Sequence, residues 1–191
     1  MKTLQLIYDK ATSISTCLQS IPLLATRWFL ALIFYFPAIE KWKNMEATIE
    51  WFGNTEWGLG LPLPEVQAYL AASTEFLGVW MLIFGFGVRL ISIPLILTMV
   101  MAIFTVHIDH GWYTIGQSAL NPEIADRISS AKDILKENEN YSWLTEKGSF
   151  VILQNGIENA VTYIIMLAIL VFVGPGKISI DYLISKKYLI I

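Results

Sequence analysis

Residues 64–86 have the sequence PEVQAYLAASTEFLGVWMLIFGF, in which Glu65 and Glu75 are the only charged residues. A helix that crosses a bilayer needs roughly 20 mostly apolar residues, and this stretch has that length and composition. Pro64 suits a first helical turn, where its missing N–H would be unpaired anyway. The stretch therefore predicts a membrane-spanning helix. Glu75 would then lie about 16 Å from either end at 1.5 Å per residue.

Three further stretches meet the same criterion, at about residues 22–43, 88–108 and 155–174. Over the 191 residues, 55% are apolar and 15% are charged, against about one quarter charged in soluble proteins. Pro37 and Pro94 fall inside two of the stretches, and membrane helices tolerate proline because neighbouring groups satisfy the freed carbonyl. We predict an all-α, integral membrane four-helix bundle that forms a single membrane domain over residues 1–191.

Two segments outside the spans have helical character. Met45, Ile49 and Phe52 recur at helical spacing beside Trp51 and Trp57, which predicts a short amphipathic helix in the membrane interface. An extramembrane loop at about residues 111–149 holds most of the charge outside the spans, and within it residues 126–140 predict a soluble amphipathic helix.

The topology is predicted from the charges and the N-terminus. The first 20 residues lack a basic region that runs into a compact apolar core, so we expect no cleavable signal peptide. Four spans put both termini on one side of the membrane. Lys and Arg divide six against six, but three on the far side (Arg127, Lys132 and Lys136) lie in the longer, partly folded loop. We therefore predict cytoplasmic termini. The net charge of -3 gives no indication of nucleic-acid binding, and Cys17 alone forms no internal disulfide.

Two charged residues fall inside predicted spans, where an ionisable group is costly and marks a candidate site. Glu75 shares its helix side with the small residues Ala68, Ala71, Ala72 and Gly78, so it should face other helices. Arg27 lies about one and a half turns inside the first span. The simpler interpretation is a buried Arg27–Glu75 pair that fixes helix register. The alternative is that Glu75 handles protons or binds a ligand.

A second polar cluster is predicted where three spans end at one membrane level. Its members are Glu40, Lys41, His107, Asp109, His110, Asn155, Glu158 and Asn159. His107 and His110 are three apart and share a helical face. Imidazole and carboxylate ligands bind Zn, Cu(II), Ni or Fe, so His107, His110 and Glu158 are candidate metal ligands. The same groups could hydrogen-bond a quinone headgroup, or simply satisfy helix ends.

Several stretches resemble a known family. Arg27 followed by Lys41 in an apolar helix, and Glu75 followed by Gly78 and 85–89 (GFGVR), resemble the first two spans of DoxX-family proteins. Residues 51–62, 89–95 and 104–107 with Gly111-Trp112 resemble its HvfX-type branch more specifically. The resemblance covers about residues 26–112 and 158–182. The sequence departs from the family pattern at Pro37-Ala38. Family members usually have a glycine there, a few residues before the lysine that corresponds to Lys41.

The resemblance implies a four-helix protein of the bacterial inner membrane. HvfX-type members are associated with gene sets that make modified, metal-binding peptides in copper handling. Other DoxX relatives resemble membrane subunits of quinone-linked thiosulfate oxidation or of oxidative-stress complexes. No catalytic residues are carried over, and the chain has no phosphate-binding loop, dinucleotide turn or nucleophile elbow.

The leading hypothesis is a non-enzymatic membrane protein that assists maturation, export or copper handling of a modified peptide, with the long loop meeting its partner. The alternative is a membrane subunit of a quinone-linked redox complex. A third hypothesis is a small transporter that acts as an oligomer. We expect a lipid bilayer and a protein partner or second copy as partners, with copper, another transition metal or a quinone as candidate ligands. His107 and His110 lie too close on one helix to face each other across a haem, so we do not expect an oxidase.

Overall fold

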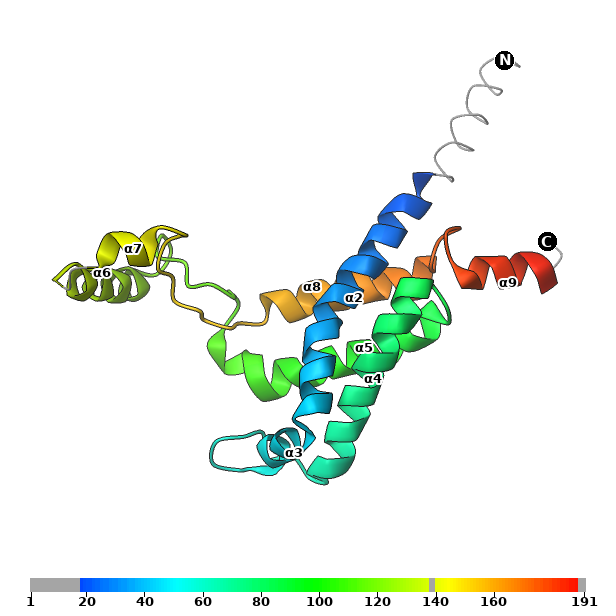
Figure 1. Ribbon diagram of the computed structural model, residues 1–191, viewed down its shortest axis with the longest axis horizontal. Coiled ribbons are helices and arrows are strands. Elements are labelled where there is room, and N and C mark those ends of the chain that lie inside the picture. The colour runs from blue at the N-terminus through cyan, green and yellow to red at the C-terminus, as the bar shows by residue number, and fades with distance from the viewer. Residues whose placement is uncertain (1–17, 138–139, 189–191) are drawn as a thin grey trace, which may run out of the picture. The chain divides into compact units, whose positions relative to one another are not determined.

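The computed structural model describes residues 18–137 and 140–188, and within these ranges every named element is helical. The all-α prediction is confirmed. Cys17 and the N-terminal residues on which the signal-peptide expectation depends lie outside the described residues, as do residues 138–139 of the predicted 126–140 helix. In chain order the elements are α2 (Ser20–Lys43), α3 (Met45–Gly53), α4 (Pro64–Phe84), α5 (Val88–Ala102), η1 (Ile103–His107), η2 (Ile108–His110), α6 (Pro122–Glu137), α7 (Tyr141–Thr145), α8 (Glu158–Val173) and α9 (Ile180–Tyr188) (Figure 1).

The chain divides into two compact units, and each is described by itself. The first runs to Met101 and resumes at Thr162, while the second comprises Ala102–Val161. The first unit therefore contains α2, α3, α4, most of α5 and α8, and α9. The single domain over residues 1–191 stays a prediction.

Four helices of the first unit share one apolar core. The buried members come from α2, α4, α5 and α8, and they are Leu30, Ala31, Phe34, Val79, Leu82, Val88, Ile91, Leu95, Leu167 and Leu170. Large apolar side chains also cover the outside, and Phe172 is 82% exposed. An apolar core inside an apolar surface is what a bundle surrounded by lipid requires. This arrangement supports the predicted membrane bundle.

Among the residues that the structure describes, three helices are long and apolar enough to cross a membrane: Ser20–Lys43, Pro64–Phe84 and Val88–His110. The fourth predicted span is shorter than expected, because α8 has 16 residues. At 1.5 Å per residue it is about 24 Å long, against roughly 30 Å of hydrocarbon core. Residues 155–157, predicted as its first turn, instead pair with the 111–114 segment, and Asn155 has a left-handed φ of 61°. That pairing delays the start of the helix.

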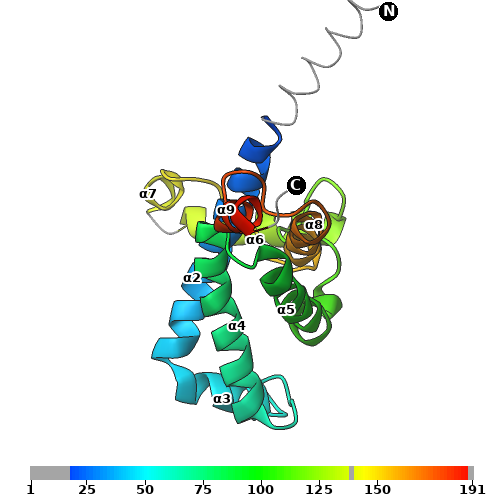
Figure 2. The same cartoon turned by 90° about the vertical axis from the view of Figure 1, so that its right-hand side faces the viewer.

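The predicted interfacial helix exists as α3, which follows α2 after one residue and packs against α4. Figures 1 and 2 both show it at one end of the α2–α4 pair. At the other end, α4 stops at Gly85, whose φ of 68° is the left-handed conformation that a helix C-terminus commonly needs. The turn through Gly87 then leads directly into α5. The α2–α4 pair is therefore bounded by α3 at one end and by the α4–α5 turn at the other.

Within the second unit, residues 111–116 pair through their backbones with residues 152–158 and form a stem. Thr114 O accepts from both Gln154 N and Asn155 N at 2.9 Å, and Gly116 N donates to Ile152 O at 2.8 Å. Beyond this stem lies α6, which begins at Pro122, four residues earlier than predicted. Asn121 Oδ1 accepts from Glu123 N at 3.0 Å there, which satisfies one of the unpaired N–H groups of the first turn.

Candidate functional site

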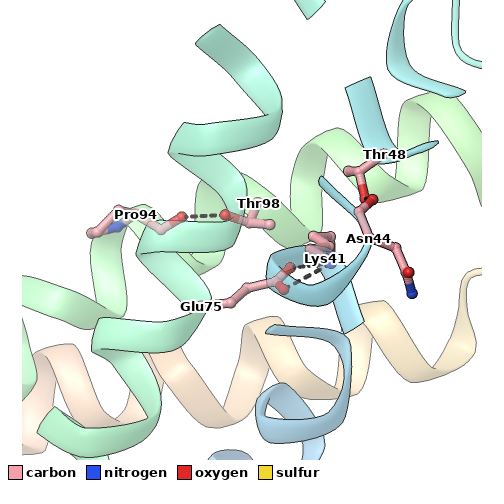
Figure 3. A network of polar contacts seen from close by, with 6 residues as sticks. All are labelled: Lys41, Asn44, Thr48, Glu75, Pro94 and Thr98. Carbon is pink, nitrogen blue, oxygen red and sulfur yellow. Dashed lines mark hydrogen bonds and ion pairs between the residues drawn. The ribbon is translucent and has the colours of Figure 1, made fainter. Parts of the chain in front are cut away.

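The buried charge pair of the first unit joins α2 to α4. Lys41 lies two residues before the end of α2, and Glu75 lies near the middle of α4. Lys41 Nζ donates to Glu75 Oε1 at 3.0 Å and to Oε2 at 2.7 Å, and Figure 3 shows the two side chains pointing toward one another. The Glu75 side chain is 4% exposed and that of Lys41 is 21% exposed. Lys41 is therefore partly accessible from outside the bundle, whereas the carboxylate that it contacts is buried.

Small residues on α4 position this pair. Ala68, Ala72 and Gly78 are buried on the same side of α4 as Glu75, as the sequence predicted. A side chain at Gly78 would collide with α5, because a Cβ there would lie 2.9 Å from Leu95 Cδ1. Thr98 of α5, drawn in the same view, donates its hydroxyl to Pro94 O at 3.0 Å (Figure 3). Neighbouring helices can approach the carboxylate closely because this side of α4 carries so little bulk.

The Lys41–Glu75 ion pair has a geometry that can hold two charges inside the bundle. Moving two charges out of water costs several kcal/mol per ion, and their mutual attraction offsets this cost only with good geometry. Two short, charge-assisted hydrogen bonds supply that geometry. A proton donor and a proton acceptor are thereby held together inside a membrane bundle. This arrangement can hydrogen-bond a polar headgroup or take up and release a proton.

Arg27 does not pair with Glu75 as the simpler interpretation predicted. Arg27 lies instead beside Gly85, the residue that caps the end of α4, ten residues from Glu75 or about 15 Å along the helix axis. A Cβ on Gly85 would lie 1.8 Å from Arg27 Nη1. Because α2 and α4 are antiparallel, Lys41 reaches the carboxylate and Arg27 reaches the far end of α4. Arg27 is nevertheless fully buried, so its predicted place in the interior is correct.

The contacts of Arg27 come from the C-terminal part of the chain. Its Nη2 donates to Ile178 O, while Nε and Nη1 have no hydrogen-bond partner among the residues that the structure describes. Asp181 acts on the guanidinium electrostatically. Arg27 is therefore a buried cation held by a carbonyl and by a nearby acid.

Asp181 is a residue that the sequence analysis missed. Its Oδ1 accepts from Gly87 N at 2.7 Å and its Oδ2 accepts from Val88 N at 3.0 Å. Its own N–H donates to Gly85 O at 3.0 Å. A carboxylate at this place satisfies the first N–H groups of α5 and interacts favourably with the helix dipole. Capping patterns are read from residues next to a helix, and this cap is more than 90 residues away in sequence.

The histidine cluster lies in the second unit, where it contacts the stem. His107 Nδ1 is 2.8 Å from Asn155 O. Because a carbonyl oxygen only accepts, this nitrogen must carry a proton. Glu158 Oε2 accepts from Thr114 N at 3.1 Å. These contacts are of the kind expected from side chains that satisfy helix ends. His110, Asp109 and Asn159 are exposed.

Among residues 18–137 and 140–188, no three or more His, Cys, Asp or Glu side chains form a group that could hold a metal ion. The metal site predicted at His107, His110 and Glu158 is thus not assembled here. Of the other predicted ligands, Glu40 and Lys41 belong to the first unit, where Glu40 Oε1 accepts from Asn44 Nδ2 at 2.5 Å.

Comparison with known proteins matches residues 22–108 to the DoxX family. "Putative oxidoreductase CatD" of Bacillus subtilis is 32% identical over 83 residues, which is 44% of this chain and 58% of that protein. An uncharacterized protein of Haemophilus influenzae is 24% identical over 172 residues, which is 88% of this chain and 86% of that one. The chain thus spans 58% of the length of the Bacillus relative, and no solved structure matches it. The segment that carries Arg27, Lys41 and Glu75 is therefore a DoxX family match.

Proposed function

We propose that this chain is a DoxX-type membrane subunit of a redox system that transfers electrons to or from a quinone in the bilayer. The observation that carries the proposal is the buried Lys41–Glu75 pair between two membrane-length helices. The Bacillus subtilis relative, "Putative oxidoreductase CatD", points the same way. The sequence has two histidines and one cysteine, so we assign the primary redox centre to a partner protein.

The chemistry assigns a role to each member of the pair. Reduction of a quinone to a quinol consumes two electrons and two protons and forms one O–H bond at each carbonyl oxygen. The partner's redox centre supplies the electrons. Lys41 Nζ donates a hydrogen bond to a quinone carbonyl oxygen, and Glu75 takes the two protons one at a time from water and passes them on through Lys41 to the two oxygens. Lys41 carries the charge opposite to the negative charge that develops on the carbonyl oxygen, and such stabilisation is strongest where water is excluded, as it is beside the buried Glu75.

The proposed location is the inner membrane of a bacterium, with several spans and cytoplasmic termini. The second unit offers a surface for the partner protein. Its amphipathic helix α6 exposes Ile134 at 62%, and Trp143 of α7 is 71% exposed. Exposed aromatic and aliphatic side chains of this kind are typical of protein contacts.

A second candidate function is assistance to a modified, copper-binding peptide system, as the HvfX-type resemblance implies. The Haemophilus influenzae relative matches 88% of this chain, so the similarity extends over the second unit as well as the first. In this case the second unit would bind the peptide and the ion pair would hold the bundle together. The third hypothesis, transport by an oligomer, has no observation of its own in its favour.

The test is the quinone content of the protein purified gently from its native membrane, measured by mass spectrometry of the lipid extract. We expect about one quinone per chain, and about a tenfold loss in Lys41→Met, because it removes the hydrogen bond from a charged group to the quinone. Glu75→Gln should give a similar loss, because it removes the carboxylate that holds Lys41 in place. Lys43→Met and Glu65→Gln are matched controls at exposed positions of the same helices. Absence of quinone from the wild type, or equal loss in the controls, would contradict the proposal. Stoichiometric copper without quinone would favour the peptide system.

A further inference from the structure

A groove of about 720 Å³ lies at the end of the first unit where its C-terminal segment packs. The start of α2, the start of α5, the end of α8 and one side of α9 surround it. The lining residues that bear on its chemistry are Leu23, Arg89, Leu90, Lys177, Asp181 and Ile184. Along α2, Leu23 is 18 residues from Lys41, about 27 Å, so the groove is distinct from the ion pair.

The position of the groove indicates the headgroup layer of a membrane. Helices α2 and α5 begin here and α8 ends here, so this is where the apolar bundle stops. The α9 helix exposes Leu183 at 64% and Tyr188 at 71%, and its last turn carries Lys186 and Lys187. Exposed apolar side chains with lysines in a short helix are typical of helices that lie in the interface. The groove is therefore within reach of lipid headgroups.

The charge of the groove favours an anion. Arg89 and Lys177 line it with exposed side chains. Asp181 is the acidic residue of the lining, and both of its carboxylate oxygens already accept from Gly87 and Val88. Arg89 donates one bond, from Nη2 to Val173 O at 3.3 Å, which holds the guanidinium at the rim. Its planar fork matches the oxygens of a phosphate.

The remaining lining completes a site for an amphiphile. Leu23, Leu90, Val173 and Ile184 give it an apolar wall, while Gln19 and Ser185 add hydrogen-bonding groups. Basic pockets between membrane helices are sites for anionic lipid headgroups. We propose that this groove binds an anionic phospholipid from the surrounding bilayer, with its phosphodiester against Arg89 and Lys177 and its acyl chains along the apolar wall.

The test uses delipidated full-length protein in an uncharged detergent, with lipid binding followed by native mass spectrometry. The probes are dioleoylphosphatidylglycerol, dioleoylphosphatidylcholine and inorganic phosphate. We expect phosphatidylglycerol to bind at least about tenfold more tightly than the zwitterionic lipid. Lys177→Gln should weaken this binding about fivefold and Arg89→Gln with Lys177→Gln about 25-fold, since each basic residue near a membrane contributes about a factor of five.

The matched control is the double variant Lys43→Gln with Arg127→Gln, which removes the same charge from exposed positions outside the groove. It should change binding less than twofold. Lys177→Gln keeps the backbone bond from Lys177 N to Ser20 Oγ, so it tests the site even if loss of Arg89 loosens the bundle. Equal binding of the two lipids, equal loss in the control, or full competition by inorganic phosphate would each overturn the proposal.

Discussion

The two ends of the α2–α4 pair bury a cation in different ways. At one end, Lys41 meets a carboxylate from the facing helix with two hydrogen bonds. At the other end, Arg27 donates to a backbone carbonyl of the C-terminal segment, and Asp181, which acts on it electrostatically, also accepts hydrogen bonds from the start of α5. A buried cation that forms an ion pair depends on one partner side chain, whereas one that is held by backbone depends on close packing. Different substitutions should therefore destabilise the two ends.

The largest effect is expected from Gly85→Ala, at the arginine end. A Cβ there would lie 1.8 Å from Arg27 Nη1 and 2.6 Å from Ser179 Cβ, in a backbone with φ of 68°. We expect loss of more than about 4 kcal/mol of unfolding free energy, or no folded protein, because steric overlap adds to the left-handed strain of about 1–2 kcal/mol. Unfolding by denaturant in detergent measures this.

Gly60→Ala is the control for that prediction. Gly60 has a similar φ of 61°, but the nearest atom to an added Cβ is 3.5 Å away. It should lose only the strain term, about 1–2 kcal/mol. Equal losses at Gly60 and Gly85 would mean that close packing at the arginine end is unimportant.

The next largest effect is expected at the lysine end. Glu75→Ala should destabilise the protein by about 3–5 kcal/mol, because it leaves Lys41 without its partner at a largely buried place. Adding Lys41→Met should recover much of this loss, since replacing both charges removes the desolvation cost as well. A double-mutant cycle on unfolding free energy gives the coupling. Additive losses in the cycle would show that the two side chains act independently.

Arg27→Met sharpens the contrast between the ends. Arg27 gives up one hydrogen bond to a carbonyl, a loss of about 1–3 kcal/mol, and two of its nitrogens have no partner among the described residues. The loss should therefore be smaller than that of Glu75→Ala, measured in the same detergent. A larger loss would place the stronger electrostatic interaction at the arginine end.

The smallest effect is expected from Asp181→Asn. The amide oxygen still accepts one of the two N–H groups of Gly87 and Val88, so we expect a loss of about 1 kcal/mol from the charge and the second bond. Hydrogen exchange at Gly87 and Val88 should rise in this variant while exchange around Lys41 is unchanged. Faster exchange at both ends would indicate that the C-terminal segment supports the entire bundle.

Much of the fold could be predicted because lipid imposes simple demands. Length and apolarity located the spans, and the small residues around Glu75 indicated which side of that helix faces the bundle. The partner of Glu75 could not be predicted, because the choice between Arg27 and Lys41 depends on how far α2 and α4 are shifted along one another. Composition does not fix that shift. The sequence predicted Lys41 in the second polar cluster because it lies near the end of its helix, yet its long side chain reaches inward to Glu75.

Contacts between segments that are distant in sequence also could not be predicted. The sequence predicted that the fourth span starts at Asn155, but residues 155–157 pair with residues 111–114 instead, so α8 starts later. The cap of α5 by Asp181 had no local signature. The predicted metal ligands were chosen by spacing on one helix, and spacing does not show whether a third ligand converges on them.

The contact between the C-terminal segment and the α4–α5 turn has a consequence for biosynthesis. A ribosome makes Arg27 and the start of α5 long before it makes Ile178 and Asp181, which satisfy them. During insertion the nascent bundle thus holds an arginine and two backbone N–H groups whose partners do not yet exist. Closure of this end of the bundle therefore waits until residue 181 has been made, and a ribosome stalled before residue 178 would leave an incompletely satisfied protein in the membrane.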